Sequence, residues 1–363
     1  METCYSIFVS KSACITGGEE NIIMIGSTNM KKILAMLLLA CMMLALVACG
    51  GSAAAAEYKL GMGISLNMDS SKAGNAQVDA CCAVVVLDKD GKIVACRIDV
   101  AQNKMDVTDG QVDTAKTFQT KLERGEDYGM RGASPIGKEW FEQAEAFEQY
   151  CVGKTADEIA GMETVVNEGG HTVTTDETLY ASCSISIDQF QDAVVKACND
   201  DQAATFTSDG TFTLGLAINS TAAESTAATA EEEGVVKMYS EFGAVVLDKD
   251  GKILAALTDA TQPQIKIDAA GEIGDKTFKG TKRELKEGYN MVAYSDATLE
   301  WYQQAKNFTD YCVGKTAADL RATETKTNDE GHNVFVDETL YASCSISVDG
   351  MIAVVAKAAD NAR

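Results

Sequence analysis

The stretch VVLDKDGKI at residues 85–93 decides the fold, because it predicts a β-hairpin and occurs twice in the chain. Apolar residues enclose an Asp-Lys-Asp-Gly segment, which is the composition of a tight turn between two strands. The same nine letters return at residues 245–253. Each half of the chain is therefore predicted to contain one such hairpin.

Two further blocks recur in the same order and at nearly the same spacing. YCVGKTA at residues 150–156 returns at 311–317, and DETLYASCSIS at 176–186 returns at 337–347. Three ordered blocks at a near-constant offset indicate an internal duplication.

We therefore predict two tandem copies of one domain, at residues 57–200 and 205–363, each able to fold alone. The low-complexity run at 219–234 is predicted to be a loop inside the second copy, because residues 212–218 before it match the first strand at 58–64.

The order of elements in each copy predicts an α+β fold: an antiparallel sheet with helices packed on one side. After the hairpin we expect a helix with Ser134 as N-cap and Pro135 in its first turn, ending at Gly153. A strand at residues 183–187 and a helix at 189–198 are expected to close the copy.

Two repeated features give finer expectations. Thr155 with Glu158, and Thr316 with Asp319, resemble capping pairs of a short helix. The two tryptophans, Trp140 and Trp301, fall at equivalent positions of the predicted long helices, where core packing is the usual role.

The N-terminal region resembles a bacterial lipoprotein signal. Met30-Lys31-Lys32 precedes an apolar run at residues 33–47, which is shorter than the roughly 20 residues of a membrane-spanning helix. The run ends in Leu-Val-Ala-Cys, similar to a lipobox, which implies lipidation of Cys49. An uncleaved signal anchor is the alternative.

This resemblance divides the first 56 residues into three parts. Residues 1–29 are interpreted as an over-extended start, 30–48 as the signal peptide and 49–56 as a tether. The protein is then expected on the extracytoplasmic face of the cell membrane, held by its lipid anchor.

The formal charge of −23 limits the possible partners. It disfavours nucleic acid and electrostatic attachment to anionic lipid, since both require clustered Lys and Arg. Residues 1–48 contain three lysines and three glutamates, so the acidity belongs to the exported part. We expect a neutral, cationic or metal-like partner of unknown identity.

No motif predicts a catalytic or metal site. The Asp88 turn lacks the further ligands of an EF-hand, and His171 and His332 have no spaced partner ligand. Ser-His-Asp, Cys-His and P-loop arrangements are missing from the sequence. A non-enzymatic role is therefore favoured.

Eight cysteines follow Cys49, and they allow two interpretations. Export would permit bridges from Cys151 to Cys183 and from Cys312 to Cys344. Buried thiols are favoured, because Cys82 and Cys96 correspond to Phe242 and Ala256 in the second copy, a pair that can only pack.

The order of elements in both copies also resembles the extracytoplasmic FMN-binding domain. DGTF at residues 209–212 is similar to the family's first strand, and ASCS at 181–184 and 342–345 stands where the family has Ser-Gly-Ala-Thr. The family's Thr can carry FMN, and Ser184 and Ser345 match it as hydroxyls near a helix start, where a phosphate could be held.

The preferred interpretation is thus a binding or interaction module on an FMN-binding-like scaffold. The alternative is a flavin-binding electron-transfer protein with one noncovalent FMN per domain, bordered by Ser184 and Ser345.

Overall fold

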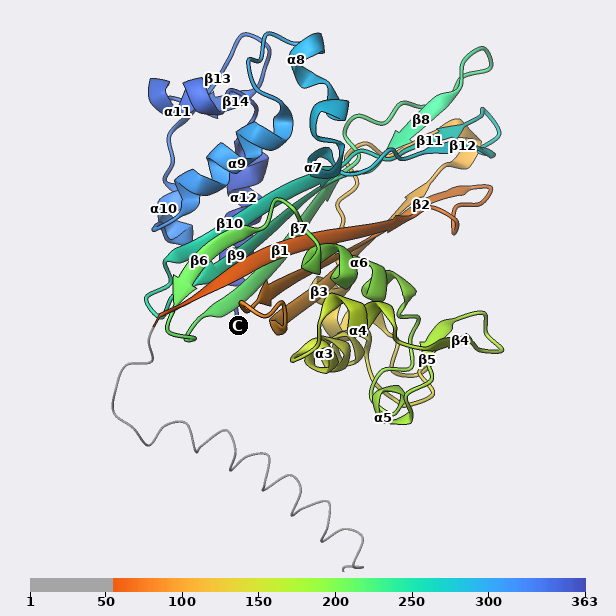
Figure 1. The fold of residues 1–363 in the computed structure, drawn as a ribbon. Helices are drawn as coiled ribbons and strands as arrows, with labels where there is room; N and C mark the ends of the chain where they lie inside the picture. Colours follow the sequence, from red (N-terminus) through yellow and green to blue (C-terminus); the bar gives the residue numbers. More distant parts are fainter. Residues whose placement is uncertain (1–54) are drawn as a thin grey trace, which may run out of the picture. The chain divides into compact units, whose positions relative to one another are not determined.

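The computed structural model describes residues 55–363, and residues 54–363 form one compact unit (Figure 1). The predicted signal peptide, the lipidation residue Cys49 and nearly all of the tether lie outside the described residues. None of the helices between residues 55 and 363 is long and apolar enough to cross a membrane.

The first half is built on three long antiparallel strands. They are β1 (Ala56–Asn67), β2 (Asn75–Leu87) and β3 (Ile93–Asp106), and β6 (Ala204–Ser208) joins them in the order β3-β2-β1-β6. The remaining elements are α2 (Lys121–Arg124), α3 (Trp140–Cys151), α4 (Ala156–Ala160), the hairpin β4 (Thr164–Val166) and β5 (Thr172–Thr174), α5 (Glu177–Tyr180) and α6 (Asp188–Cys198).

The second half follows the same order of elements, with its long strands interrupted. Its sheets have the orders β10-β9-β7 and β12-β11-β8. Their strands are β7 (Thr213–Thr221), β8 (Gly234–Lys237), β9 (Tyr239–Leu247), β10 (Ile253–Thr261), β11 (Gln264–Ile267) and β12 (Ile273–Thr277). Pro263 lies between β10 and β11, where a missing N–H interrupts the ladder.

Apart from α8 (Met291–Tyr294), which has no counterpart, the helices of the second half match those of the first. They are α7 (Lys282–Leu285), α8 (Met291–Tyr294), α9 (Trp301–Cys312), α10 (Ala317–Arg321), α11 (Glu338–Ser343) and α12 (Asp349–Asp360), with the hairpin β13 (Thr325–Thr327) and β14 (Asn333–Phe335). The predicted α+β class, with antiparallel sheets, is confirmed.

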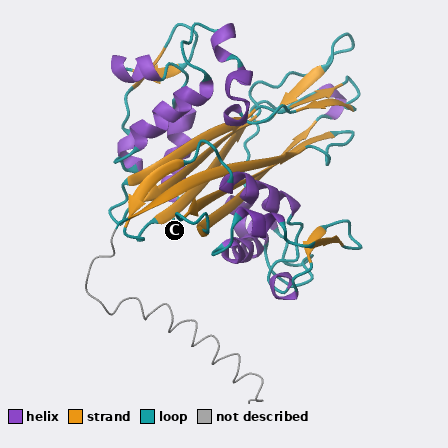
Figure 2. Cartoon of the chain, viewed as in Figure 1, coloured by secondary structure: helices purple, strands orange, loops and turns teal. Residues whose placement is uncertain are grey.

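The alternation of side chains along β2 explains the layers. Cys81, Ala83 and Val85 pack under α3 and α6, while the even-numbered residues from Ala80 to Val86 face the strands of the second half. Because both faces of the sheet are buried here, β2 is apolar throughout residues 80–87. The helices therefore cover the outer faces of the two sheets, whose inner faces meet (Figure 2).

The two halves share this inner core. Leu60, Met62 and Ile64 of β1 lie in one cluster with Leu214 and Phe242 of the second half. The predicted ranges 57–200 and 205–363 are thus not separate compact units in the structure, because each supplies one wall of a common core.

Glycines on β1 let α6 lie directly on the sheet. A Cβ on Gly61 would stand 2.0 Å from the carbonyl oxygen of Ala197, and one on Gly63 would stand 2.2 Å from that of Ala193. These contacts are with backbone atoms, so a side chain there would displace the helix.

Several local predictions are confirmed. The Asp88 carboxylate accepts the N–H groups of Asp90 and Lys92, and Gly91 has a φ of 75°, so the segment is a closed hairpin turn. Thr155 and Thr316 both form capping boxes. Trp140 and Trp301 are buried.

Two local predictions are wrong. Helix α3 begins at Trp140 with Glu139 as its cap, not at Ser134 and Pro135, because Glu139 and Glu142 form the capping box. Residues 183–187 are not a strand: the Cys183 N–H closes a turn to Leu179, and Ser184 binds a helix side chain instead of a neighbouring strand.

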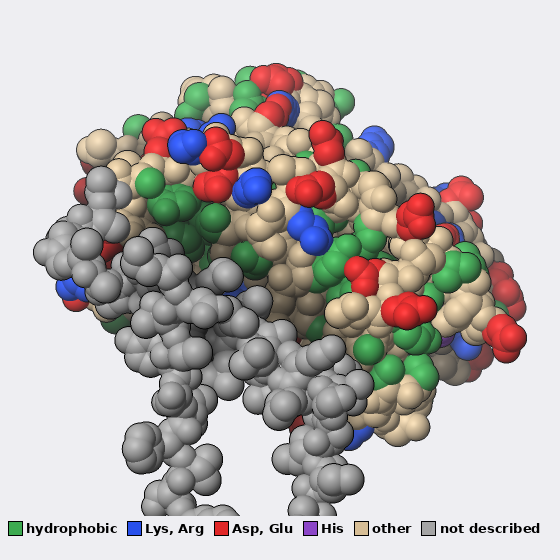
Figure 3. Space-filling model, turned by 60° about the horizontal axis from the view of Figure 1, so that its bottom comes forward, with side chains coloured by type: hydrophobic (Ala, Val, Ile, Leu, Met, Phe, Trp, Pro, Cys, Tyr) green, Lys and Arg blue, Asp and Glu red, His purple; other side chains and the backbone are tan. Residues whose placement is uncertain are grey.

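Carboxylates are dispersed over the surface that Figure 3 shows, with Lys and Arg side chains between them. Many of these charges pair locally, for example Arg131 with Glu126 and Glu142.

Candidate functional site

The two serines that the flavin resemblance implicates are held by glutamines. The N–H and the hydroxyl of Ser184 both donate to Oε1 of Gln143, at 2.9 and 3.1 Å. Ser345 makes the same pair of bonds to Gln304, at 2.8 and 3.2 Å. Ser184 thus ties the loop before α6 to α3, and Ser345 ties the loop before α12 to α9. The role of the two serines toward FMN stays a prediction.

The cysteines and histidines do not form a metal centre in the described part of the chain, where no cluster of three potential ligands occurs. The eight cysteines there are free thiols. Cys82 faces the core between the sheets while Cys96 faces the helices, so these two cannot be bridged. His171 and His332 are exposed.

A different residue, Lys282, stands out because its amine is buried among aromatic rings. Its Nζ lies 5.1 Å from the ring centroids of Tyr239, Tyr289 and Trp301, and we call these four residues the Lys282 cluster. The side chain is only 8% exposed. It makes no hydrogen bond and no ion pair with any residue in the range 55–363.

Burial lowers the pKa of Lys282 to about 8. Desolvation disfavours the ammonium form and lowers the pKa. The carboxylates of Glu241 and Asp259 and the three ring faces favour the ammonium form, but their effect on the pKa is smaller. Glu241 is itself buried, which raises its pKa.

The local sequence fixes the position of Lys282. Thr281 caps α7, and Oδ1 of the buried Asp259 accepts the N–H groups of Arg283 at 3.0 Å and Ala260 at 2.7 Å. Burial raises the pKa of Asp259 to about 6 despite these bonds. A carboxylate from β10 thus holds the short helix that presents the lysine.

The first half has an incomplete version of the same cluster. The Nζ of Lys121 on α2 lies 5.2 Å from the ring centroid of Tyr128 and 5.5 Å from that of Trp140. Asp99 holds α2 through the N–H of Leu122, as Asp259 holds α7. The register position of Tyr239 is taken by Asp79, so a third ring is missing and Lys121 is only half-buried.

A cavity of about 350 Å³ opens beside Lys282. Its wall includes the aromatic rings of Tyr289 and Phe278 and the amides of Gln262 and Gln264. The hydroxyl of Tyr289 donates to Oε1 of Gln262 at 3.3 Å. We call this space the Lys282 cavity; its lining combines two lysines, Lys279 and Lys282, with two amides and two rings.

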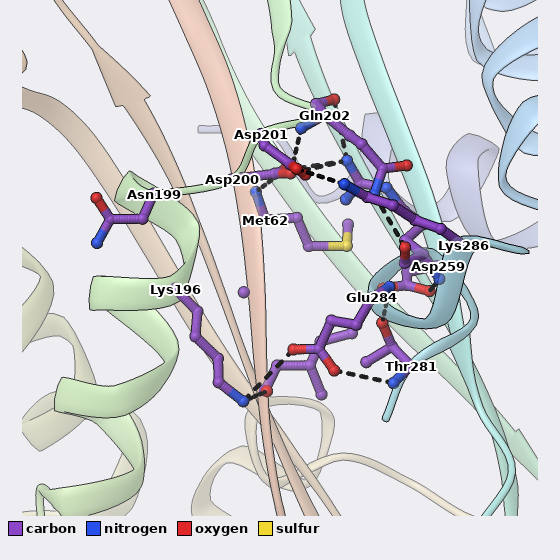
Figure 4. Close-up of a pocket in the computed structure, with 13 residues that line it drawn as sticks. Met62, Lys196, Asn199, Asp200, Asp201, Gln202, Asp259, Thr281, Glu284 and Lys286 are labelled. Carbon is purple, nitrogen blue, oxygen red and sulfur yellow. Dashed lines mark hydrogen bonds and ion pairs between the residues drawn. The ribbon is translucent and has the colours of Figure 1, made fainter. Parts of the chain in front are cut away.

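A second cavity, of about 310 Å³, lies at the junction of the two halves (Figure 4). There Arg283 donates to both carboxylate oxygens of Asp200, at 3.0 and 3.1 Å, and both side chains are buried. Lys196 on α6 reaches the carbonyl of Ile64 at 3.0 Å and Glu284 at 3.5 Å. Since these charges are already paired, this cavity joins the halves and offers few free groups to a ligand.

Sequence reasoning did not identify the Lys282 cluster, although a signal was present. KTF at residues 116–118 returns at 276–278. Thr-Lys comes one residue later in the first copy and two residues later in the second, and tyrosine follows seven residues after the lysine in both. Tyr239 and Trp301 come from distant elements, so the complete set of rings is visible only in the fold.

No family model matches the chain, and no solved structure matches it. A protein named chlorophenol reductase from Desulfitobacterium hafniense is 35% identical over 88 residues, which cover 20% of this chain and 27% of the relative. The chain thus spans about a quarter of the length of the curated relative it matches.

Proposed function

We propose that this protein is a lipid-anchored binding protein of the extracytoplasmic face, whose ligand is a small oxygen-bearing molecule in the Lys282 cavity. One observation carries the proposal: Lys282, which is 8% exposed and whose amine has no hydrogen-bond partner among the described residues, lines a cavity of about 350 Å³. Burying such a group is costly unless a partner satisfies it, and such groups concentrate at functional sites.

The lining of the cavity indicates the chemistry of the ligand. Lys282, Gln262 and Gln264 supply N–H donors, and the rings of Phe278 and Tyr289 supply apolar contact. This combination favours a small molecule with a ring or apolar part and an acceptor oxygen. The net charge of −23 disfavours a polyanion.

The anchoring part of the proposal is supported by the sequence at residues 30–49 alone, with its charged start, apolar run and terminal Cys49. Two acyl signals are generally needed for stable attachment, and a lipobox cysteine carries more than one chain.

The name of the partial relative suggests a first set of probes. A chlorophenol has both an aromatic ring and an acidic oxygen, which are the two features that the cavity favours. We would titrate phenol, 2-chlorophenol, benzoate and benzaldehyde into the full chain by calorimetry.

We expect at least one of these probes to bind, and Lys282→Met to weaken that binding. Losing one hydrogen bond to a charged group costs about 1.5–3 kcal/mol, which is roughly a tenfold to hundredfold change in Kd. Lys121→Met, the equivalent change in the first half, is the control and should bind normally. Failure of all four probes, or equal binding by Lys282→Met, would refute the assignment.

A further inference from the structure

We propose that Lys282 is a nucleophilic amine that forms a reversible imine with a small aldehyde or ketone in its cavity. The inference rests on the proposed binding function and names the reactive class among its possible ligands. It gives Lys282 a covalent role that ordinary hydrogen bonding to a ligand does not require.

The geometry leaves the amine available for reaction. Lys282 lines the cavity, and its Nζ lies at the same 5.1 Å from three ring centroids, so the side chain is held in one direction. An amine becomes nucleophilic only when its lone pair is free, and a carboxylate in an ion pair would keep it protonated. Among the described residues Lys282 has no such ion pair, although Glu241 and Asp259 are near enough to influence it.

Burial among apolar rings also supplies the neutral amine that the reaction needs. With its pKa lowered to about 8, Lys282 is neutral in a much larger fraction of molecules than a surface lysine. Against an ordinary pKa near 10.4, the gain in neutral amine at neutral pH is on the order of 200-fold. A desolvated lysine is one of the established ways to activate this nucleophile.

The reaction balances with the groups present. The Nζ lone pair attacks the carbonyl carbon, the C=O electron pair takes up a proton, and the nitrogen loses one, which gives a carbinolamine. The hydroxyl then leaves as water and a C=N bond forms, so amine and carbonyl become imine and water without oxidation or reduction. The Gln262 and Gln264 amides lie in the same wall and can donate to the carbonyl oxygen before attack.

The first half supplies an internal control. Lys121 follows the equivalent cap, Thr120, on the equivalent short helix α2. Two rings surround it instead of three, and it is half-buried. We therefore expect Lys121 to react like other surface lysines.

Borohydride trapping tests the inference. The full chain would be incubated at about pH 8 with benzaldehyde or butanal, reduced with sodium borohydride, and analysed by intact mass and peptide mapping. We expect one dominant secondary-amine adduct at Lys282, formed at least tenfold faster than at Lys121. The adduct should be absent from Lys282→Arg, which keeps a cation in the ring cluster, and unchanged in Lys121→Arg.

The outcomes separate the inference from the proposed function. Adducts spread over exposed lysines, or equal labelling of Lys121 and Lys282, would overturn the imine. If calorimetry shows probe binding that depends on Lys282 while trapping yields no adduct there, the imine is refuted and the binding function stands. Thermal unfolding of each variant checks that loss of the adduct is not loss of the fold.

Discussion

The buried carboxyl of Asp99 makes the stability of this protein depend on pH in a predictable direction. Asp99 is 3% exposed, and burial raises its pKa to about 6, although its Oδ1 accepts the N–H groups of Val100 and Leu122 at 2.7 and 3.1 Å. A raised pKa means that the folded state binds the proton more tightly than the unfolded state, whose Asp titrates near 3.9. The contribution of Asp99 to the free energy of unfolding is therefore fully present below about pH 4 and is lost as the pH rises through 6.

The magnitude follows from the shift. Two pKa units correspond to about 3 kcal/mol in total. Since the unfolded-state carboxyl is about half ionised at pH 4, the free energy of unfolding should fall by about 2 kcal/mol between pH 4 and 7 on account of Asp99. Glu148 and Asp259, whose pKa values burial also raises to about 6, add dependence of the same sign. The comparison with Asp99→Asn isolates one of the three, because asparagine keeps an acceptor oxygen but does not titrate.

Urea unfolding of the full chain at pH 4, 5, 6 and 7 provides the assay. We expect the wild type to lose about 2 kcal/mol more than Asp99→Asn over this range. Surface carboxylates contribute equally to both proteins, so they cancel in the difference. Parallel pH profiles for the two proteins would refute the assignment of a raised pKa to Asp99.

Three further predictions concern the anchor, the flavin and the two halves. Cys49→Ala should abolish incorporation of labelled palmitate and release the protein from membranes, and equal labelling of both proteins would contradict lipidation. Any flavin should be bound noncovalently, and Ser184→Ala and Ser345→Ala should weaken that binding. Purified protein should then lose its yellow colour on denaturation and filtration. Flavin fluorescence that stays with the polypeptide on a denaturing gel would contradict noncovalent binding. Residues 57–200 expressed alone expose the apolar face of β1 and β2, so we expect sedimentation to show self-association, and a monomer that unfolds cooperatively would show that the shared core is not required.

The sequence predicted well what neighbouring residues decide. The turn at Asp88 closes through bonds to residues two and four positions away, and the capping boxes at Thr155 and Thr316 span three residues. Such contacts depend on local composition, and the same composition appears in both halves.

The predictions from sequence failed where contacts between residues that are not neighbours in the chain determine the local structure. Helix α3 starts late because the Glu139 carboxylate accepts the N–H groups of Met130 and Arg131, which ties the preceding loop to the helix start. The alternating residues at 183–187 resemble a strand, yet the N–H of Ser184 donates to the side chain of Gln143, about forty positions away, and not to a neighbouring strand. The Lys282 cluster likewise needs rings from β9 and α9.

The shared core was also invisible in the periodicity of the strands. Apolar residues on both faces of β2 are compatible with a sheet covered by helices on both sides or by helices and a second sheet. Only the fold shows that the second cover is the other half of the chain.

The titration of Lys282 tests the central claim most directly. Trp301 belongs to the Lys282 cluster, and Trp140→Phe leaves it as the only tryptophan of the chain. Burial raises the pKa of Tyr239 and of Tyr289, so these hydroxyls stay neutral near pH 8. We predict that Trp301 fluorescence in Trp140→Phe changes with a midpoint near pH 8, and that Lys282→Met removes this transition. A midpoint at or above about pH 10, the range of an ordinary lysine, or a transition near pH 8 that persists in Lys282→Met, would contradict a buried and reactive amine at this site.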